Sequence, residues 1–75
     1  MVKNLIKSSL LVALGNRIRT FRLRKGMNQN AFALNCNMGK SSMLKIESGQ
    51  VNLSYLTMHG IRSGLGISMM VLCAE

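Results

Sequence analysis

The side chains that most often carry enzyme chemistry are few in this sequence, and they are widely separated. The chain contains two carboxylates, Glu47 and Glu75, one histidine, His59, and two cysteines, Cys36 and Cys73. So few acids nearly exclude acid–base catalysis by paired carboxylates, and one histidine with two cysteines cannot supply the four ligands of a structural zinc site. We therefore expect no catalytic residue, no metal site and no cofactor.

The chemistry that the composition does favour is binding to a polyanion. Lys and Arg number 10 against 2 acids, which gives a net charge of +8 and a pI near 10.6. This balance points to nucleic acid first and to an anionic membrane surface second. Hydrophobic residues make up 48% of the 75 residues, enough for one small domain with a compact core.

Cysteine usage and hydropathy place this domain in a reducing, aqueous compartment. The two cysteines fit no metal-binding or redox spacing, so ordinary core thiols in a cytoplasmic protein are expected, with a single disulfide as the alternative. The uninterrupted apolar run from residue 10 to residue 14 has five residues and the one from residue 69 to residue 74 has six, whereas a membrane span needs roughly 20. No small-residue cleavage site follows Lys3 and Lys7, so we expect the N-terminus to belong to the mature protein.

The elements that position the cations are expected to be short helices linked by tight turns. The chain has no Pro, and its seven Gly fall mostly between the expected helices. Leu11, Leu14, Ile18 and Phe21 recur at spacings of 3, 4 and 3, which is the apolar stripe of one helix. Gly26 is well placed to end that helix in the left-handed conformation.

One repeated pattern, the hydrophobic staple, marks three further helix starts. In a staple, an apolar residue before the N-cap packs against a residue four positions into the helix. The three caps are Asn28, Gly39 and Ser54, and their apolar pairs are Met27 with Phe32, Met38 with Met43, and Leu53 with Met58. Helices are therefore expected to begin near residues 28, 39 and 54.

The second and third helices are joined by a very short turn. Only Asn37 and Met38 precede the cap of the third helix, and Asn tolerates the left-handed conformation that such a turn needs. Two short helices so closely joined are typical of a helix-turn-helix. Gly49 ends the third helix, and Gly66 ends a fourth. The apolar stripe of the fourth helix is Tyr55, Met58, Ile61 and Leu65.

The tail ISMMVLC, residues 67–73, is apolar except for Ser68. This composition fits a short strand buried on both faces or a last helical turn. A strand would need a partner strand, which a second subunit would supply most simply. The residues expected to make the dimer are Ile67, Met69, Met70, Val71 and Leu72.

Residues 14–68 resemble the Xre-type, lambda-repressor-like helix-turn-helix family. The matching stretch is LGNRIRTFRLRKGMNQNAFALNCNMGKSSMLKIESGQVNLSYLTMHGIRSGLGIS. The positions that carry the match include Arg22, Gly26, Gln29, Ala33, Ser41, Ile46, Glu47, Gly49, Asn52, Leu65 and Gly66. The resemblance implies an all-α domain of four to five helices, with or without a C-terminal strand that pairs across a dimer. Its parts would be an N-terminal extension (1–13), the DNA-binding domain (14–66) and a dimerisation segment (67–75).

The resemblance also implies how DNA is contacted, with the third helix in the major groove of double-stranded DNA. There Lys40 can donate to guanine O6 and N7, Ser41 can donate or accept, and Leu44 can touch a thymine methyl. The alternatives are a solvated lysine and, for Leu44, a contact within the protein. The full expected set is Asn28, Gln29 and Asn30 at the DNA backbone, Lys40, Ser41, Ser42 and Leu44 at the bases, and Lys45, Gln50 and Asn52 at phosphates.

Two further groups of charged residues have other expected roles. In the family, the positions of Arg22 and Glu47 form a structural ion pair between the first helix and the end of the third, and a buried carboxylate without such a partner would be costly. The arginines at 17, 19, 22 and 24 are read either as a nucleic-acid patch or as a solvated helix surface that adds long-range attraction.

The tail suggests which kind of DNA-binding protein this is. It looks like the end of HipB-type antitoxins, which repress their own operon as homodimers and bind a HipA-type kinase toxin. Phage repressors and restriction-modification controller proteins end instead in a fifth helix, for which this tail is expected to be too short and too rich in Val, Leu and Met. The preferred hypothesis is thus an antitoxin on a near-palindromic operator, and the alternative is a phage-type or controller-type regulator without a toxin. A membrane-surface peptide is a third hypothesis, disfavoured by the spaced caps and turn glycines.

Overall fold

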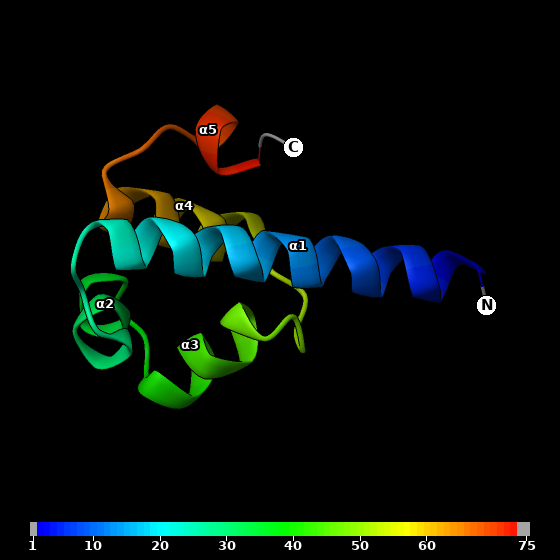
Figure 1. The fold of residues 1–75 in the computed structure, drawn as a ribbon, viewed down its shortest axis with the longest axis horizontal. Helices are drawn as coiled ribbons and strands as arrows, with labels where there is room; N and C mark the ends of the chain where they lie inside the picture. The colour runs from blue at the N-terminus through cyan, green and yellow to red at the C-terminus, as the bar shows by residue number, and fades with distance from the viewer. Residues whose placement is uncertain (1, 74–75) are drawn as a thin grey trace.

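The computed structural model describes residues 2–73, with side chains from residue 9 onward. Met1, Ala74 and Glu75, which close the two terminal segments expected above, lie outside the described residues. Within the described range every regular element is a helix (Figure 1). The five helices are α1 (Val2–Arg24), α2 (Gln29–Asn35), α3 (Lys40–Glu47), α4 (Tyr55–Leu65) and α5 (Met69–Cys73). The predicted all-α fold is confirmed.

The other four helices are arranged around helix α1. It runs the length of the molecule, with α2 and α3 below it, α4 behind it and α5 above it in the view of Figure 1. Its predicted apolar stripe faces the core, since Ile18 is fully buried and Leu14 and Phe21 pack against the buried residues. The N-terminal extension is a continuation of this helix from Val2.

The predicted helix starts are confirmed at all three caps. Asn28, Gly39 and Ser54 each have the extended backbone conformation of an N-cap. The Asn28 side chain accepts a hydrogen bond from the backbone N–H of Ala31 at 2.8 Å, and Ser54 Oγ accepts one from that of Thr57 at 3.1 Å. Gly39 has no side chain with which to cap α3.

The helix ends and the tight turn also follow the prediction. Asn37 has φ 57°, the left-handed conformation expected between α2 and α3. Gly26, Gly49 and Gly66, at the ends of α1, α3 and α4, have φ of 72°, 76° and 68°. The chain therefore reverses direction where residues that accept positive φ occur.

A single core joins all five helices. Its buried members are Ile18, Phe32, Ala33, Cys36, Met43, Ile46, Ile61, Leu65 and Leu72. Both cysteines are free thiols, so the disulfide alternative is wrong. Cys36 is buried between α2 and α4, where burial raises the pKa of its thiol to about 11, and Cys73 is exposed.

Helix α4 differs from the prediction at one position of its stripe. Ile61 and Leu65 are fully buried and Met58 packs against the core, but Tyr55 is 69% exposed. The Tyr55 ring instead makes an edge contact with the ring of His59, with centroids 4.6 Å apart. Tyr55 is the first residue of α4, so its side chain lies at the end of the helix, beyond the packed turns.

The tail forms the helix α5, so the strand alternative is wrong, as is the expectation that the tail could not support a fifth helix. Ser68 caps α5, its Oγ accepting a hydrogen bond from the N–H of Val71 at 3.1 Å. At the other end, Arg17 Nη1 donates to the carbonyl of Leu72 at 3.2 Å. Leu72 itself is fully buried in the core of this chain, so tertiary packing supplies what the short sequence lacks in helix propensity.

None of the helices in residues 2–73 combines the length and the apolar character that a membrane span requires.

Candidate nucleic-acid interface

Helix α3 has one face in the core and one face in solvent. Met43, Ile46 and Glu47 are buried, and their spacing of three and four residues places them on a single side of the helix. The remaining side chains project outward. These exposed residues are Lys40, Ser41, Ser42, Leu44 and Lys45. The structure thus presents all the side chains expected at base edges, and Leu44 is 50% exposed rather than held inside the protein.

The C-terminal end of α3 packs closely against α1. A Cβ atom added to Gly15 would lie 2.6 Å from the carbonyl oxygens of both Ile46 and Glu47. No larger residue fits at this crossing without moving one of the helices. Sequence reasoning missed the role of Gly15, because a glycine inside a helix indicates close packing only once the neighbouring helix is known.

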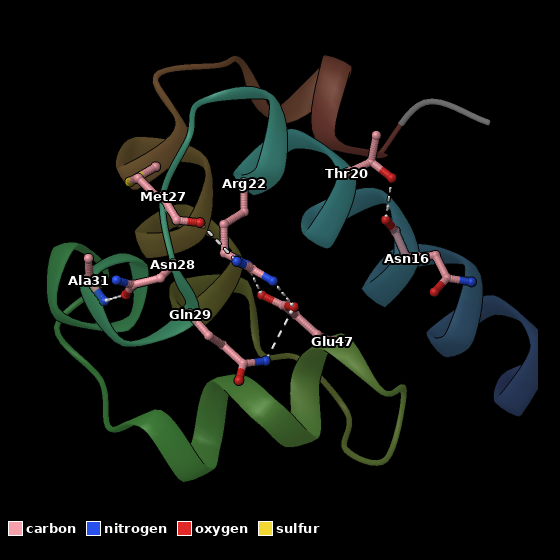
Figure 2. A network of polar contacts seen from close by, with 8 residues as sticks. All are labelled: Asn16, Thr20, Arg22, Met27, Asn28, Gln29, Ala31 and Glu47. Atoms are coloured by element: carbon pink, nitrogen blue, oxygen red, sulfur yellow. Dashed lines mark hydrogen bonds and ion pairs between the residues drawn. The ribbon is translucent and has the colours of Figure 1, made fainter.

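The ion pair implied by the family resemblance is present at this crossing (Figure 2). Arg22 Nε donates to Glu47 Oε2 at 2.8 Å, and Nη2 donates to Oε1 at 3.1 Å. The third nitrogen, Nη1, donates to the carbonyl of Met27 at 2.8 Å. Both residues are 7% exposed, so the pair is bidentate and largely shielded from water.

Gln29 extends this network to the start of α2. Its Nε2 donates to Glu47 Oε1 at 3.3 Å (Figure 2). Glu47 therefore ties α1, through Arg22, and α2, through Gln29, to the end of α3. This network fixes the angle between the two helices of the helix-turn-helix. The half-buried Gln29 side chain is thus committed to the protein, whereas the sequence had suggested only a contact with the DNA backbone.

The other residues expected at the DNA backbone and phosphates come from the start of α2 and from the loop after α3. Asn28 and Asn30 are exposed at the start of α2, and Gln50 and Asn52 are exposed in the loop after α3. In the view of Figure 1, α2, α3 and this loop all lie below α1. In particular, a hollow between α3 and the loop is lined by Ser42, Lys45, Asn52 and Thr57, together with core residues.

The four arginines of α1 divide into two kinds. Arg17 and Arg22 are held by acceptors within the protein, namely the Leu72 carbonyl and Glu47. Arg19 and Arg24 are exposed, and the Arg24 guanidinium lies 5.9 Å from the centre of the Phe21 ring. The family resemblance had set Arg22 apart, but the sequence carries no signal for Arg17, because backbone acceptors such as the Leu72 carbonyl occur at every residue.

Across the part of the chain that the structure describes, no three His, Cys, Asp or Glu side chains gather where they could hold a metal ion. His59 is engaged with Arg62, whose Nε donates to His59 Nδ1 at 3.2 Å.

Comparison with known proteins finds similar structures but no matching sequence family. No family model matches the sequence, and no curated protein matches it. Among solved structures, the restriction-modification controller protein C.AhdI from Aeromonas hydrophila is 29% identical, with a TM-score of 0.83 over 87% of this chain and 94% of that one. The clp gene regulator ClgR from Corynebacterium glutamicum is 25% identical, with a TM-score of 0.79 over 84% of this chain and 82% of that one.

A third structure, the hypothetical transcription factor NHTF from Neisseria, is 22% identical, with a TM-score of 0.81 over 89% of this chain and 77% of that one. At this identity the likeness concerns the fold alone. Together these structures show that the chain has the fold of helix-turn-helix transcription regulators.

Proposed function

We propose that this protein is a sequence-specific DNA-binding transcription regulator that acts as a repressor by occupying its operator. The observation that carries the proposal is the outer face of α3. Five exposed polar, cationic or apolar side chains, from Lys40 to Lys45, stand on a helix whose other face is locked into the core. This rigid, outward presentation occurs in a fold shared with a controller protein and a gene regulator.

The chemistry of each side chain on and after α3 indicates whether it would contact bases or phosphates. Lys40 and Ser41, in the first turn of α3, would reach base edges in the major groove. Lys45, Gln50 and Asn52 would reach phosphates and supply affinity without sequence preference. Because cations neutralise phosphates and release counterions, the affinity should fall steeply as salt is added. Such a regulator works where the chromosome is, in the cytoplasm.

The proposal is tested by selecting binding sites for the purified protein from a library of random DNA duplexes. We expect a consensus with two inverted half-sites whose centres lie roughly 34 Å apart, one helical turn. Fluorescence anisotropy should then give an affinity for this duplex that exceeds that for a shuffled duplex by about 10³-fold or more. Equal affinity for the two duplexes across a range of salt concentrations would contradict the proposal.

Two inverted half-sites require a homodimer, and the charge distribution favours α5 as its seam. Nine of the ten Lys and Arg residues lie between residues 3 and 45, and residues 63–73 contain no charged residue. On α5, Met70 is 82% exposed and Val71 is 45% exposed. A second copy of this chain can cover these apolar side chains with little like-charge repulsion, because the cation beside α5, Arg17, donates to the Leu72 carbonyl and α5 itself carries no charge. Leu72, expected earlier at the seam, is in the core of its own chain.

Sedimentation of matched variants tests this seam. Met70→Lys places a charge at an exposed position on α5, and we expect it to shift the protein from dimer to monomer. Leu34→Lys is the control, because Leu34 is a 69% exposed apolar residue on α2, and this variant should remain dimeric. A Met70→Lys variant that dimerises as well as the unsubstituted protein would contradict an α5 seam.

Within this class, the antitoxin and the controller-type regulator remain two candidate roles. The likeness of the tail to a pairing strand was the reason to prefer the antitoxin, and a helical α5 takes that reason away. A neighbouring gene for a kinase-like protein whose product forms a complex with this one in purified form would support the antitoxin with a HipA-type partner. A neighbouring restriction enzyme or phage operon, with no such complex, would support the regulator without a toxin.

A further inference from the structure

Helix α3 is bordered by a hollow on each of its long sides. The hollow on the α4 side contains Lys45. The hollow on the opposite side lies between α1 and α3, and it is lined by Asn16, Arg19, Gln29 and Ser48 together with Leu44 and the Arg22–Glu47 pair. Asn16 and the ion pair can be seen along this side in Figure 2. The hollow with Lys45 includes two residues that had been assigned to phosphates, Lys45 and Asn52, whereas in the second hollow only Gln29 had been assigned to the DNA backbone.

The electrostatics of the second hollow suit an anion. Glu47 is its only acid, and that carboxylate is neutralised by the bidentate contact with Arg22. The net charge of the lining is therefore that of Arg19. Among the described residues, no hydrogen bond or ion pair engages the Arg19 guanidinium, which is exposed. A cation without a protein acceptor, beside neutral amide and hydroxyl groups, is available to bind a phosphate.

The dimensions of duplex DNA place phosphates at both hollows. The major groove is about 12 Å wide, and an α-helix with its side chains is about 10–12 Å across. A recognition helix therefore fills the groove, with one sugar-phosphate strand along each of its sides. We propose, resting on the proposed function, that Arg19 binds a backbone phosphate on the α1 side of α3, while Lys45 binds the opposite strand. In this arrangement α1, which is not part of the helix-turn-helix, contributes a second phosphate contact to the interface.

The test compares Arg19→Ala with Arg24→Ala, two exposed arginines of α1 whose substitution removes the same charge. Binding to the selected duplex and to a shuffled duplex is measured over a salt series. We expect Arg19→Ala to weaken both by similar factors of about tenfold and to lower the slope of log affinity against log salt by about 0.9, the value of one phosphate contact. Arg24→Ala should lose much less and leave the slope unchanged. Equal losses in the two variants, or no loss in Arg19→Ala, would overturn the proposal.

Ethylation interference locates the contact on the DNA. With the unsubstituted protein, ethylated phosphates on both strands of each half-site should block binding. Arg19→Ala should lose this sensitivity on one strand only, and Lys45→Ala should lose it on the other. The same sensitive phosphates in all three proteins would overturn the proposal while leaving the proposed function intact. If the unsubstituted protein binds no duplex at all, both the proposed function and this contact fail.

Discussion

Glu47 is the residue on which the geometry of the helix-turn-helix depends. Its side chain is buried and accepts hydrogen bonds from Arg22 on α1 and Gln29 on α2. Removing one member of such a pair leaves the other charge buried without compensation, which costs more than the pair contributes. The role of Glu47 is therefore structural, and its loss should be felt in folding before it is felt in DNA recognition.

We predict that Glu47→Ala lowers the free energy of unfolding by about 3–5 kcal/mol, because it strands the Arg22 guanidinium in the core. The double variant Arg22→Met with Glu47→Leu removes both charges and should recover most of that loss. Urea unfolding of the three proteins measures the difference. A double variant less stable than Glu47→Ala would show that the pair contributes more than its burial costs.

The Cys36 thiol gives the protein a pH dependence at alkaline pH. Burial raises its pKa from 9.0 to about 11, so between these values the unfolded chain loses a proton that the folded chain retains. The contribution to stability is present below pH 9 and is lost as the pH rises towards 11. The free energy of unfolding should therefore fall more steeply over this interval than in a Cys36→Ala variant. Parallel curves for the two proteins would refute this prediction.

At the residue scale, the sequence predicted the side chains that cap helices and turn the chain, because cap and turn preferences are local. The ion pair of Arg22 and Glu47 followed from the family resemblance. The partners of Gln29 and Arg17 could not be predicted, since they depend on which acceptors the packed helices bring within reach.

At the scale of elements, the contact between α2 and α4 is set by two glycines on α4 with different surroundings. A Cβ atom added to Gly64 would lie 2.8 Å from Cys36 Sγ, whereas one added to Gly60 would be no closer than 3.5 Å to its nearest neighbour, the Cys36 carbonyl. Gly64 therefore lies at a close contact between the two helices, whereas Gly60 has room beside it.

We predict opposite effects for the two alanine substitutions. Gly60→Ala should stabilise the protein by up to about 1 kcal/mol, because alanine is the better helix former and space is available. Gly64→Ala should destabilise it by about 1–3 kcal/mol, because the added methyl group overpacks the contact with Cys36. Thermal or urea unfolding decides the signs, and stabilisation by both substitutions would mean that α2 and α4 are not closely packed at Gly64.

Helix α5 shows where a prediction at this scale fails. A short apolar run does not distinguish a strand from a buried helical turn, so the sequence left both open and the tail was expected to be too short for a fifth helix. The deciding interactions are tertiary, namely the burial of Leu72 and the hydrogen bond from Arg17. The capping pattern of Ser68 ahead of MMVLC was the local signal that could have indicated the helix.

At the scale of the whole molecule, the cations and the uncharged residues occupy different parts of the chain. The cations lie almost entirely between residues 3 and 45, which form α1 and the helix-turn-helix, while residues 63–73 are uncharged. The overall helical fold could be predicted from spaced caps, turn residues and apolar stripes that agree with one another. The side chains that we propose to face DNA could be predicted as a surface, but the hollow with Arg19 required the packing of α1 against α3.

The central claim is that α3 enters the major groove with Lys40 at base edges and Lys45 at a phosphate. Its most direct test is the affinity of Lys40→Ala and Lys45→Ala for the selected operator and for operators changed at single base pairs. We predict that Lys40→Ala loses discrimination at one base position, by about 1–3 kcal/mol, and that Lys45→Ala weakens binding to all the duplexes alike. If both variants lose affinity equally on every duplex, α3 does not read bases through Lys40 and the account is wrong.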